Sequence, residues 1–309
     1  ITVGDPGGIG PEIILKSLPS LLDKSDALFI LLGPRPVFSF WSDRLGISFP
    51  SHPNLKIVEI KGDMDRVKIG RDAEENGRIS FFAFRAAVSL AEKGELDSVV
   101  TAPISKLSWH MAGIHWAGHT EFLQSTYPDA IMSFWAENLR VALLSHHIPL
   151  REALERVTKD GMIQFIRRLH RSLGAYGMEG YTFLVAGLNP HAGESSLLGR
   201  EEDLEIRPAL DAVRAEGIPV EGPYPPDIVF RMARGLMDRI VIALYHDQGL
   251  IAFKLDAFET GVNATLGLPF VRTSPDHGTA FDIAGNNTAD PSSLISAVRL
   301  ALRFLAGQA

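Results

Sequence analysis

The chain has 309 residues, enough for a large core and two lobes, and its 46% hydrophobic and 22% charged residues are typical of a globular protein. Its net charge of −7 disfavours nucleic acid and anionic membranes as partners. The absence of cysteine excludes disulfides and thiolate metal sites, so a transition metal would need histidine and carboxylate ligands.

No apolar run approaches the ~20 residues that a membrane-spanning helix needs. The N-terminus also lacks the basic-then-apolar pattern of a secretory signal. We therefore expect a cytoplasmic protein. The start at Ile1 rather than at a methionine indicates that a few residues precede this sequence.

The first predicted element is a short strand at residues 1–3, which runs into a glycine-rich turn at residues 4–12. Pro11 then opens an apolar-periodic helix that continues to Leu22, since proline is favoured in the first turn of a helix. Such a turn exposes backbone N–H groups that can bind an anion or a dinucleotide. The spacing differs from the G-x-G-x-x-G pattern, so a tight turn without a ligand is an equally good interpretation.

Apolar runs and helical periodicity predict the remaining elements. Strands are expected at residues 27–32, 55–60, 99–102, 131–134, 139–145, 183–188 and 240–244. Helices are expected at residues 36–45, 72–93, 151–173, 201–216 and 291–305. Strands that alternate with helices indicate largely parallel sheets covered on both faces. The polar groups between residues 244 and 285 are expected mostly on turns and strand ends, where sites are usually built.

Three histidines follow apolar strands, and they are His147, His191 and His246. Ligands gather at the carboxyl ends of strands in open α/β sheets, so these imidazoles are predicted to converge on one metal. Neutral imidazoles suit divalent zinc, cobalt, nickel or iron. Asp247 could orient His246 or act as a further ligand. For any one histidine taken singly, a hydrogen-bonded structural role is the alternative.

Other polar side chains suit an anionic substrate. His119 and Thr120 lie at a predicted helix start, where N–H groups and a hydroxyl can contact an oxyanion or a phosphate. The alternative is that Thr120 merely caps the helix. Lys254 and Arg272 suit a substrate with carboxylate or phosphate groups, and surface ion pairs are the alternative for each.

Six motifs occur in order along nearly the whole chain. They are Gly4-Asp5-Pro6-Gly7-Gly8-Ile9-Gly10-Pro11-Glu12, Thr101-Ala102-Pro103-Ile104-Ser105-Lys106, Gly118-His119-Thr120-Glu121, Leu188-Asn189-Pro190-His191-Ala192-Gly193-Glu194, Tyr245-His246-Asp247-Gln248-Gly249 and Arg272-Thr273-Ser274-Pro275-Asp276-His277-Gly278-Thr279-Ala280. This ordered set resembles the 4-hydroxythreonine-4-phosphate dehydrogenases, the PdxA family. Gly8, Ser195-Ser196 and His146 depart from the family pattern without removing a required group. His147 is preferred over His146 as the ligand because it directly precedes Ile148-Pro149-Leu150.

The resemblance implies a two-lobed α/β/α fold, similar to isocitrate and isopropylmalate dehydrogenases, with mostly parallel central sheets. Residues 1–125 and 265–309 would form the first lobe. Residues 126–264 would form the second, which would carry most metal ligands and the dimer interface. The resemblance also implies an obligate homodimer with its active site in the interlobe cleft at the subunit interface.

The resemblance also assigns roles to individual residues. The metal ligands would be His147, His191 and His246, contributed from both subunits. The substrate-binding residues would be His119, Thr120, Lys254, Asn263 and Arg272. The general base is open between Asp247 and a metal-bound water. By analogy with isopropylmalate-type enzymes, the nicotinamide cofactor would contact Gly8, Gly10, Asp276 and Asn287.

The implied reaction is the oxidation and decarboxylation of 4-phosphooxy-L-threonine to 3-amino-2-oxopropyl phosphate in pyridoxal 5'-phosphate biosynthesis. It would use NAD or NADP and a divalent metal, which would be Zn, Co or Mg. The nearest alternative is a sibling dehydrogenase for D-threonate or D-erythronate 4-phosphate, and dihydrodiol-dicarboxylate dehydrogenases are also similar. A phosphate acyltransferase shares the broad fold but has no need of three histidines around a metal. A non-catalytic binder of phosphorylated ligands would leave those histidines without a use.

Overall fold

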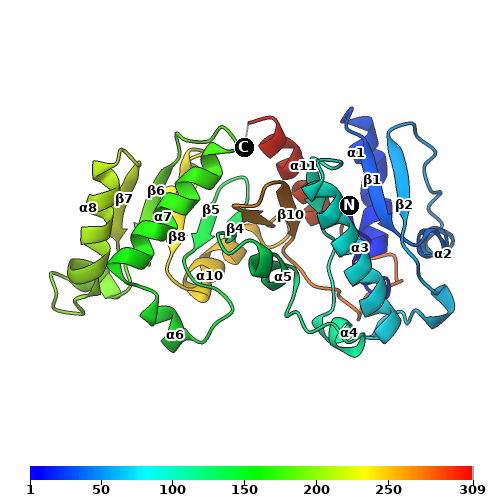
Figure 1. The fold of residues 1–309 in the computed structure, drawn as a ribbon, viewed down its shortest axis with the longest axis horizontal. Coiled ribbons are helices and arrows are strands. Elements are labelled where there is room, and N and C mark those ends of the chain that lie inside the picture. The colour runs from blue at the N-terminus through cyan, green and yellow to red at the C-terminus, as the bar shows by residue number, and fades with distance from the viewer. Residues whose placement is uncertain (308–309) are drawn as a thin grey trace. The chain divides into compact units, whose positions relative to one another are not determined.

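The computed structural model describes residues 1–307, and the chain divides into two compact units (Figure 1). Unit 1 consists of Ile1–Pro128 and Pro269–Leu305, and unit 2 is formed mainly by Asp129–Leu268. Unit 1 is therefore discontinuous in sequence, because unit 2 is inserted between its two segments.

Parallel strand pairs form the centre of unit 1. Its elements are α1 (Gly10–Asp23), β1 (Phe29–Gly33), α2 (Arg35–Leu45), β2 (Leu55–Glu59), the 3₁₀ turn η1 (Met64–Arg66), α3 (Glu74–Glu92), β3 (Ser98–Val100), α4 (Lys106–Met111), α5 (His119–Thr126), β10 (Val271–Pro275) and α11 (Ser292–Leu305). Strand β1 pairs in parallel with β2, and β3 pairs in parallel with β10. Instead of the predicted strand at residues 1–3, Thr2 forms isolated bridges to Leu32 and Thr101, which join the two pairs.

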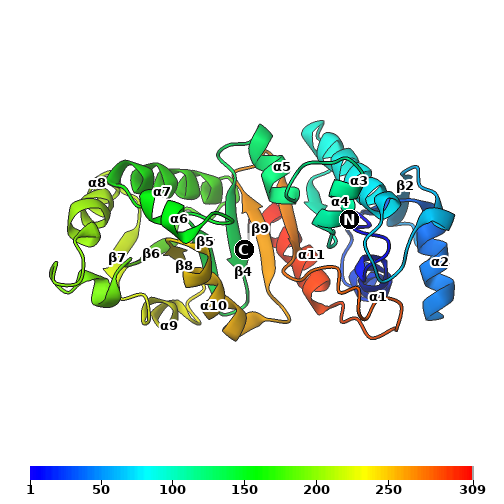
Figure 2. The ribbon, with the colours of Figure 1, turned by 90° about the horizontal axis from the view of Figure 1, so that it is seen from below.

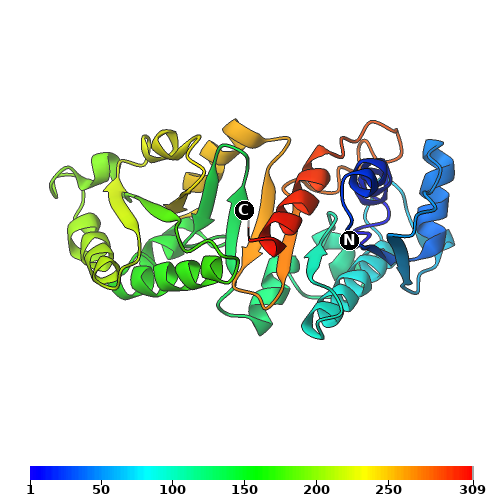
Figure 3. The same cartoon turned by 90° about the horizontal axis from the view of Figure 1, so that it is seen from above.

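Helices cover both sides of these strands. Helix α3 contacts β1 and β3 from one side, whereas α11 contacts β3 and β10 from the other, with α1 beside it (Figure 2). Helix α11 runs along β10 (Figure 3) because its apolar residues recur every three or four positions. The residues Leu294, Ala297, Val298, Ala301 and Phe304 are buried on that face.

Six strands of a mixed sheet form the centre of unit 2. The elements are β4 (Ile131–Trp135), β5 (Arg140–Leu143), α6 (Leu150–Glu155), α7 (Lys159–Gly174), β6 (Thr182–Ala186), the turn η2 (Pro190–Gly193), the π-helix η3 (Glu202–Ile206), α8 (Arg207–Ala215), β7 (Val220–Tyr224), α9 (Val229–Ala233), β8 (Arg239–Ala243), α10 (His246–Ala257) and β9 (Val262–Leu266). The strand order is β9-β4-β5-β8-β6-β7. Strands β5, β8, β6 and β7 are mutually parallel, whereas β4 is antiparallel to both β5 and β9. The predicted fold, with mostly parallel sheets, is confirmed, and β4 is the exception.

The core of unit 2 lies between this sheet and its helices. Helix α7 lies on one face, and α9 and α10 lie on the other (Figure 2). Val141 of β5 and Val241 of β8 pack with Val229 of α9 and Phe253 of α10 in one cluster of fully buried side chains. In the described part of the chain, no helix combines the length and the apolar character that crossing a membrane requires.

Two predicted helices are interrupted in the structure. The helix predicted at residues 151–173 is divided into α6 and α7, because Thr158 accepts a hydrogen bond from Gly161 N at 3.1 Å and so caps a new helix. The helix predicted at residues 201–216 begins as the π-helix η3 and continues as α8. Pro208 lies in the first turn of α8 and has no N–H group, so regular α-helical hydrogen bonding is interrupted before it.

The residues that follow β8 form a helix, not the predicted turns. His246 lies in the first turn of α10, and Lys254 lies in its last turn. The sequence pattern did not indicate this helix because both of its faces are apolar. The buried face contains Leu250, Phe253 and Ala257, and the exposed face contains Ile251 and Leu255, with Phe258 directly after the helix.

Candidate active site

A buried arginine–histidine pair lies in unit 1. Arg272, on β10, is 3% exposed, and its Nη2 donates hydrogen bonds to Thr101 Oγ1 at 2.7 Å and to His119 Nδ1 at 3.2 Å. Thr101 directly follows β3, the strand that pairs with β10, so the register of the two strands brings it to the guanidinium. Burial lowers the pKa of Arg272 to about 10, while Glu121 acts to raise it, so the group stays charged at neutral pH.

His119 is held as a neutral ring. Its ring centroid lies 4.4 Å from that of Phe84, and burial, followed by the charge of Arg272, lowers the pKa of His119 well below 6.5. Because a guanidinium only donates, Nδ1 is the acceptor and the ring proton lies on Nε2. Among the described residues, this buried Nε2 has no hydrogen-bond partner. It is therefore a donor available to an anionic ligand.

Thr120 is the second residue of α5, and it is only 6% exposed. The N-cap of α5 is Gly118, and no side chain makes a capping hydrogen bond there. The interpretation of Thr120 as a mere helix cap is therefore wrong. It shares the first turn of α5 with His119, where unsatisfied N–H groups and the helix dipole favour an anion.

Two further predicted substrate-binding residues lie in unit 2. Lys254 is on α10, with its Nζ 5.9 Å from the ring centroid of Phe258. Asn263 is on β9, opposite Phe134 of β4. Both side chains are partly buried, and their part in substrate binding stays a prediction.

The predicted cofactor segments lie together within unit 1. Gly8 and Gly10 are buried in the turn before α1, and Ile9 N donates to Thr279 O at 2.9 Å. A Cβ atom at Gly8 would lie 2.8 Å from Thr279 O, and one at Gly10 would lie 2.7 Å from Val3 O. Close backbone packing is thus sufficient to require both glycines, and their contact with a cofactor stays a prediction.

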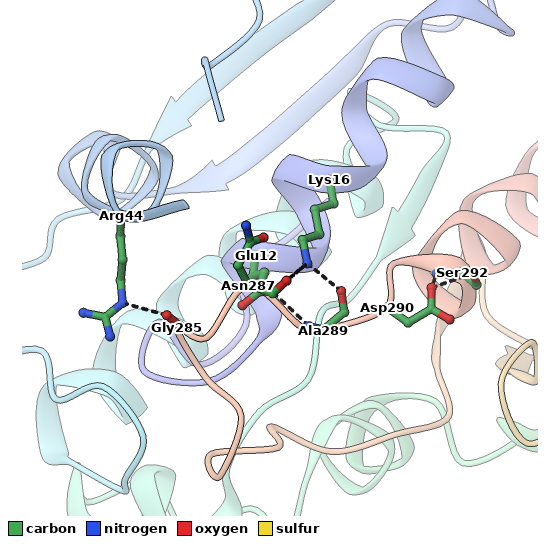
Figure 4. A network of polar contacts seen from close by, with 8 residues as sticks. All are labelled: Glu12, Lys16, Arg44, Gly285, Asn287, Ala289, Asp290 and Ser292. Atoms are coloured by element: carbon green, nitrogen blue, oxygen red, sulfur yellow. Dashed lines mark hydrogen bonds and ion pairs between the residues drawn. The ribbon is translucent and has the colours of Figure 1, made fainter. Parts of the chain in front are cut away.

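Polar contacts anchor the loop that carries Asn287 (Figure 4). Lys16 Nζ donates to Glu12 Oε1 at 2.8 Å, to Asn287 O at 3.0 Å and to Ala289 O at 2.9 Å. The buried Glu12 carboxylate also accepts from Ala289 N at 2.9 Å. Arg44 Nε donates to Gly285 O at 3.2 Å, at a position earlier in the same loop. The loop is thereby fixed to α1 and α2 beside the glycine-rich turn.

Asp5 is a fully buried acid in the glycine-rich turn. Its Oδ1 accepts from Gly7 N at 2.8 Å. Burial raises the pKa of Asp5 to about 6, and the hydrogen bond from Gly7 opposes this effect only in part. Ionisation of Asp5 therefore opposes folding.

We expect Asp5→Asn to flatten the dependence of stability on pH. The carboxyl has a pKa of about 3.9 in an unfolded chain and about 6 in the fold, so the folded state binds the proton more tightly. This contribution is complete below about pH 4 and is lost as the pH rises through about 6, a difference of about 2–3 kcal/mol. Asparagine retains the acceptor for Gly7 N and does not titrate. The free energies of unfolding of the wild type and of Asp5→Asn, measured in urea across this pH range, should converge at low pH. Parallel curves for the two proteins would contradict the prediction.

Two of the three predicted metal ligands lie together in unit 2. His147 follows β5 and His246 follows β8, and these are adjacent parallel strands, so their carboxyl ends deliver both rings to one place. The ring centroids lie 5.7 Å apart. Both residues line a cavity of about 230 Å³ together with His146 and Asp247. His246 Nδ1 lies 2.7 Å from Asp247 Oδ1, which is the contact expected of an orienting carboxylate.

His146 is a further candidate ligand beside His147. The two ring centroids lie 5.1 Å apart, and both side chains offer ligand atoms within 4.8 Å of each other. The third predicted ligand, His191, lies on η2 and is exposed. It is not among the residues that line this cavity. The convergence of His147, His191 and His246 on one metal therefore stays a prediction.

Hydrogen bonds tie together the strand ends that carry these histidines. Ser145 Oγ donates to Leu244 O at 2.8 Å, which links the ends of β5 and β8. Gln248 accepts from Leu244 N at 2.7 Å and donates to Gly187 O at 2.8 Å, which links β8 to the segment leading to His191. The sequence did not indicate these contacts, nor that of Thr101 with Arg272, because the partners are distant along the chain.

Comparisons with known proteins identify the family. The family model described as "Pyridoxal phosphate biosynthetic protein PdxA" matches residues 41–301. The chain belongs to the PdxA family. A relative from Beijerinckia indica, named 4-hydroxythreonine-4-phosphate dehydrogenase, is 43% identical over 98% of this chain and 94% of its own. The predicted family is thus confirmed.

Other PdxA-like proteins extend this comparison. A crystal structure of 4-hydroxythreonine-4-phosphate dehydrogenase from Klebsiella pneumoniae is 36% identical, with a TM-score of 0.86 and coverage of 100% of this chain and 97% of that chain. A relative from Clostridium botulinum, provisionally named D-threonate 4-phosphate dehydrogenase, is 36% identical over 98% of this chain and 96% of its own.

More distant likenesses concern the fold alone. A branched-chain phosphotransacylase from Enterococcus faecalis is 11% identical with a TM-score of 0.56, over 98% of both chains. Isocitrate dehydrogenase from Methylococcus capsulatus is 13% identical with a TM-score of 0.50, over 99% of this chain and 85% of that chain. The PdxA-family chain thus has the predicted isocitrate dehydrogenase-like fold.

Proposed function

We propose that this chain oxidises and decarboxylates 4-phosphooxy-L-threonine to 3-amino-2-oxopropyl phosphate, with NAD as hydride acceptor and a divalent metal as cofactor. The names of its relatives support the reaction. The observation that carries the substrate class is the buried pair of charged Arg272 and neutral His119. Hydrogen-bond donors in a buried site bind phosphate or carboxylate strongly, because water competes little there.

Residues of unit 1 would bind the anionic groups of the substrate. Thr101 holds the guanidinium of Arg272, and His119 presents its Nε2–H group. Thr120 and the first-turn N–H groups of α5 would supply further donors. Lys254 of unit 2 would add positive charge, as the family pattern implies.

Residues of unit 2 would hold the metal through His147, His191 and His246. The donor set fits, because two imidazoles line one cavity and Asp247 engages the Nδ1 of His246, which leaves Nε2 to bind the ion. When bound, a divalent ion such as zinc, cobalt or magnesium supplies Lewis-acid stabilisation of negative charge on a substrate oxygen.

Asp247 remains the proposed general base. One oxygen contacts His246, and the side chain is 74% exposed, so the carboxylate can exchange a proton with solvent. Asn263 of β9 would supply an amide to the substrate. Gly8, Gly10, Asp276 and Asn287 would contact NAD, and the anchored loop in Figure 4 supports this assignment because a fixed backbone can be shaped for one ligand.

The active enzyme would be a homodimer that uses the exposed apolar face of α10. Ile251, Leu255 and Phe258 are 64%, 86% and 75% exposed and follow one another at helical spacing. A continuous apolar surface of this kind is typical of a protein interface. His246 opens the same helix, so dimerisation would fix an element that carries a metal ligand.

The experiment that tests this function measures NADH formation by the purified chain with 4-phosphooxy-L-threonine and zinc, cobalt or magnesium. Turnover that depends on the metal and stops on chelation is expected. Full activity in the metal-free protein, or no turnover with any of these metals, would contradict the proposal.

The second candidate is a D-threonate or D-erythronate 4-phosphate dehydrogenase, which the Clostridium botulinum relative supports. The same residues would act on this substrate, which carries a hydroxyl group in place of the amine. A higher kcat/KM for D-threonate 4-phosphate in the same assay would select it. A phosphate acyltransferase has only the likeness of fold in its favour.

We expect Arg272→Lys to lower kcat/KM for the phosphorylated substrate by at least about 10-fold, since an ammonium cannot reproduce the fixed donors of a guanidinium. The hydrogen bonds to Thr101 and His119 would be lost together. Steady-state kinetics check this, with Arg299→Lys on the exposed face of α11 as the matched control. Equal kcat/KM for both variants would exclude Arg272 from substrate binding.

A further inference from the structure

Six consecutive residues of unit 2 lie in the left-handed region of the backbone. Their φ angles are 55° at His191, 52° at Ala192, 83° at Gly193, 43° at Glu194, 56° at Ser195 and 68° at Ser196. Only glycine adopts this region freely, and five of the six residues carry a side chain. Such a backbone persists only where the surroundings over-determine it, and strain of this kind gathers at functional sites.

The left-handed conformation coincides with predicted metal ligands. His191 opens the segment at residues 191–196, and His147, with φ of 46°, is also left-handed. A left-handed residue turns the chain sharply and changes the direction of its side chain. Left-handed backbone at both predicted ligands therefore indicates that the backbone conformation sets the direction of the two imidazole rings.

A buried carboxylate fixes the chain just before this segment. Glu202 is 1% exposed, and its Oε1 accepts hydrogen bonds from Leu188 N at 2.8 Å and Asn189 N at 2.7 Å. Its Oε2 accepts from Asn189 Nδ2 at 2.9 Å. Three N–H donors on one carboxylate set the direction in which the chain enters the left-handed segment.

The same carboxylate also packs against the middle of the segment. A Cβ atom at Gly193 would lie 2.8 Å from Glu202 Oε2, so glycine is required there by both space and φ. Glu202 is the first residue of the π-helix η3, a rare element that is frequent at functional sites. Among the six motifs of the family pattern none contains Glu202, and its partners lie 13 or more positions away.

We propose that Glu202 is a positioning residue that holds the segment at residues 191–196 so that His191 can bind the metal, an inference that rests on the proposed function. The charge of the carboxylate is required as well as its shape. In Glu202→Gln the new NH2 group would face either Asn189 Nδ2 or the backbone N–H groups of Leu188 and Asn189, so a donor meets a donor in both orientations. Asn189 cannot relieve this by turning its amide over, because Nδ2 also donates to Glu201 Oε2 at 2.7 Å.

The experiment compares zinc affinities of the full chain, measured by competition with a chelating indicator. Glu202→Gln is expected to bind zinc about 10- to 100-fold more weakly than the wild type, the usual effect of removing a group that orients a metal ligand. His191→Ala should lose at least as much affinity. Glu137→Gln changes the same charge at an exposed site between β4 and β5, and it should leave the affinity unchanged.

A second variant disturbs the segment without replacing Glu202. Gly193→Ala places a methyl group against Glu202 Oε2 in left-handed backbone, so it should also weaken zinc binding, and it decides the question if Glu202→Gln does not fold. Failure of the wild type to bind zinc, and also cobalt and magnesium in the same competition assay, would refute the proposed function. If His191→Ala weakens zinc binding but Glu202→Gln leaves it unchanged, this inference alone is overturned. Where Glu202→Gln does not fold, unchanged zinc binding in Gly193→Ala has the same consequence.

Discussion

Replacing His246 with alanine is expected to abolish measurable zinc binding and to lower kcat by about 10³-fold, since a Lewis acid contributes several kcal/mol to stabilising charge in the transition state. The reason is geometric. His246 lies 5.7 Å from His147 between ring centroids, and both line the same cavity. Removal of one ring would leave too few imidazoles to retain the ion. Zinc titration and steady-state kinetics on the same preparation would measure both effects.

A graded series separates loss of a ligand from loss of its orientation. Asp247→Asn retains a hydrogen-bond acceptor for His246 Nδ1 but removes the negative charge, so zinc affinity should fall by about 10- to 100-fold. His110→Ala is the matched control, because His110 is exposed on α4 in unit 1. Wild-type zinc affinity and kcat in His246→Ala would remove this histidine from the metal site.

Elements with one clear hydrophobic period could be predicted from the sequence. Helix α11 has a buried stripe every three or four residues, and β8 is a short apolar run, so both were found nearly to the residue. Helix α10 was missed because its outer face is as apolar as its inner face. No single apolar stripe marks this helix in the sequence, and its outer apolar residues are explained only if a partner covers them. The short strands β9 and β10 were not predicted either, since polar residues such as Asn263 and Arg272 interrupt them.

The candidate site was predictable in its residue types but not in its contacts. His147 and His246 could be placed together because the ends of parallel strands share one edge of a sheet. Nothing in the local pattern indicates that Arg272 holds the proton of His119 on Nε2, or that Glu202 binds the chain before His191. These contacts join residues that are distant in sequence, and they depend on packing that a single chain's pattern does not contain.

We expect Leu255→Glu to convert the proposed homodimer into monomers at micromolar concentration and to abolish turnover. Leu255 is 86% exposed in the single chain, so its replacement should cost the monomer little stability. In a two-fold dimer the change occurs twice, and burying a leucine contributes about 1.5–3 kcal/mol, so the dissociation constant should rise by about 10²- to 10⁴-fold. Sedimentation velocity over a range of concentrations would measure it.

The matched control is Leu28→Glu, which adds the same charge at a half-exposed leucine of unit 1. It should leave both the oligomeric state and turnover unchanged. Phe258→Glu, three residues after Leu255 and directly after α10, should reproduce the effect of Leu255→Glu. Helix α10 begins at His246, a predicted metal ligand. Monomers that keep zinc affinity but lose turnover would therefore show that the partner subunit contributes to substrate binding and not to metal binding. A fully active monomer would show that one chain is sufficient for the reaction.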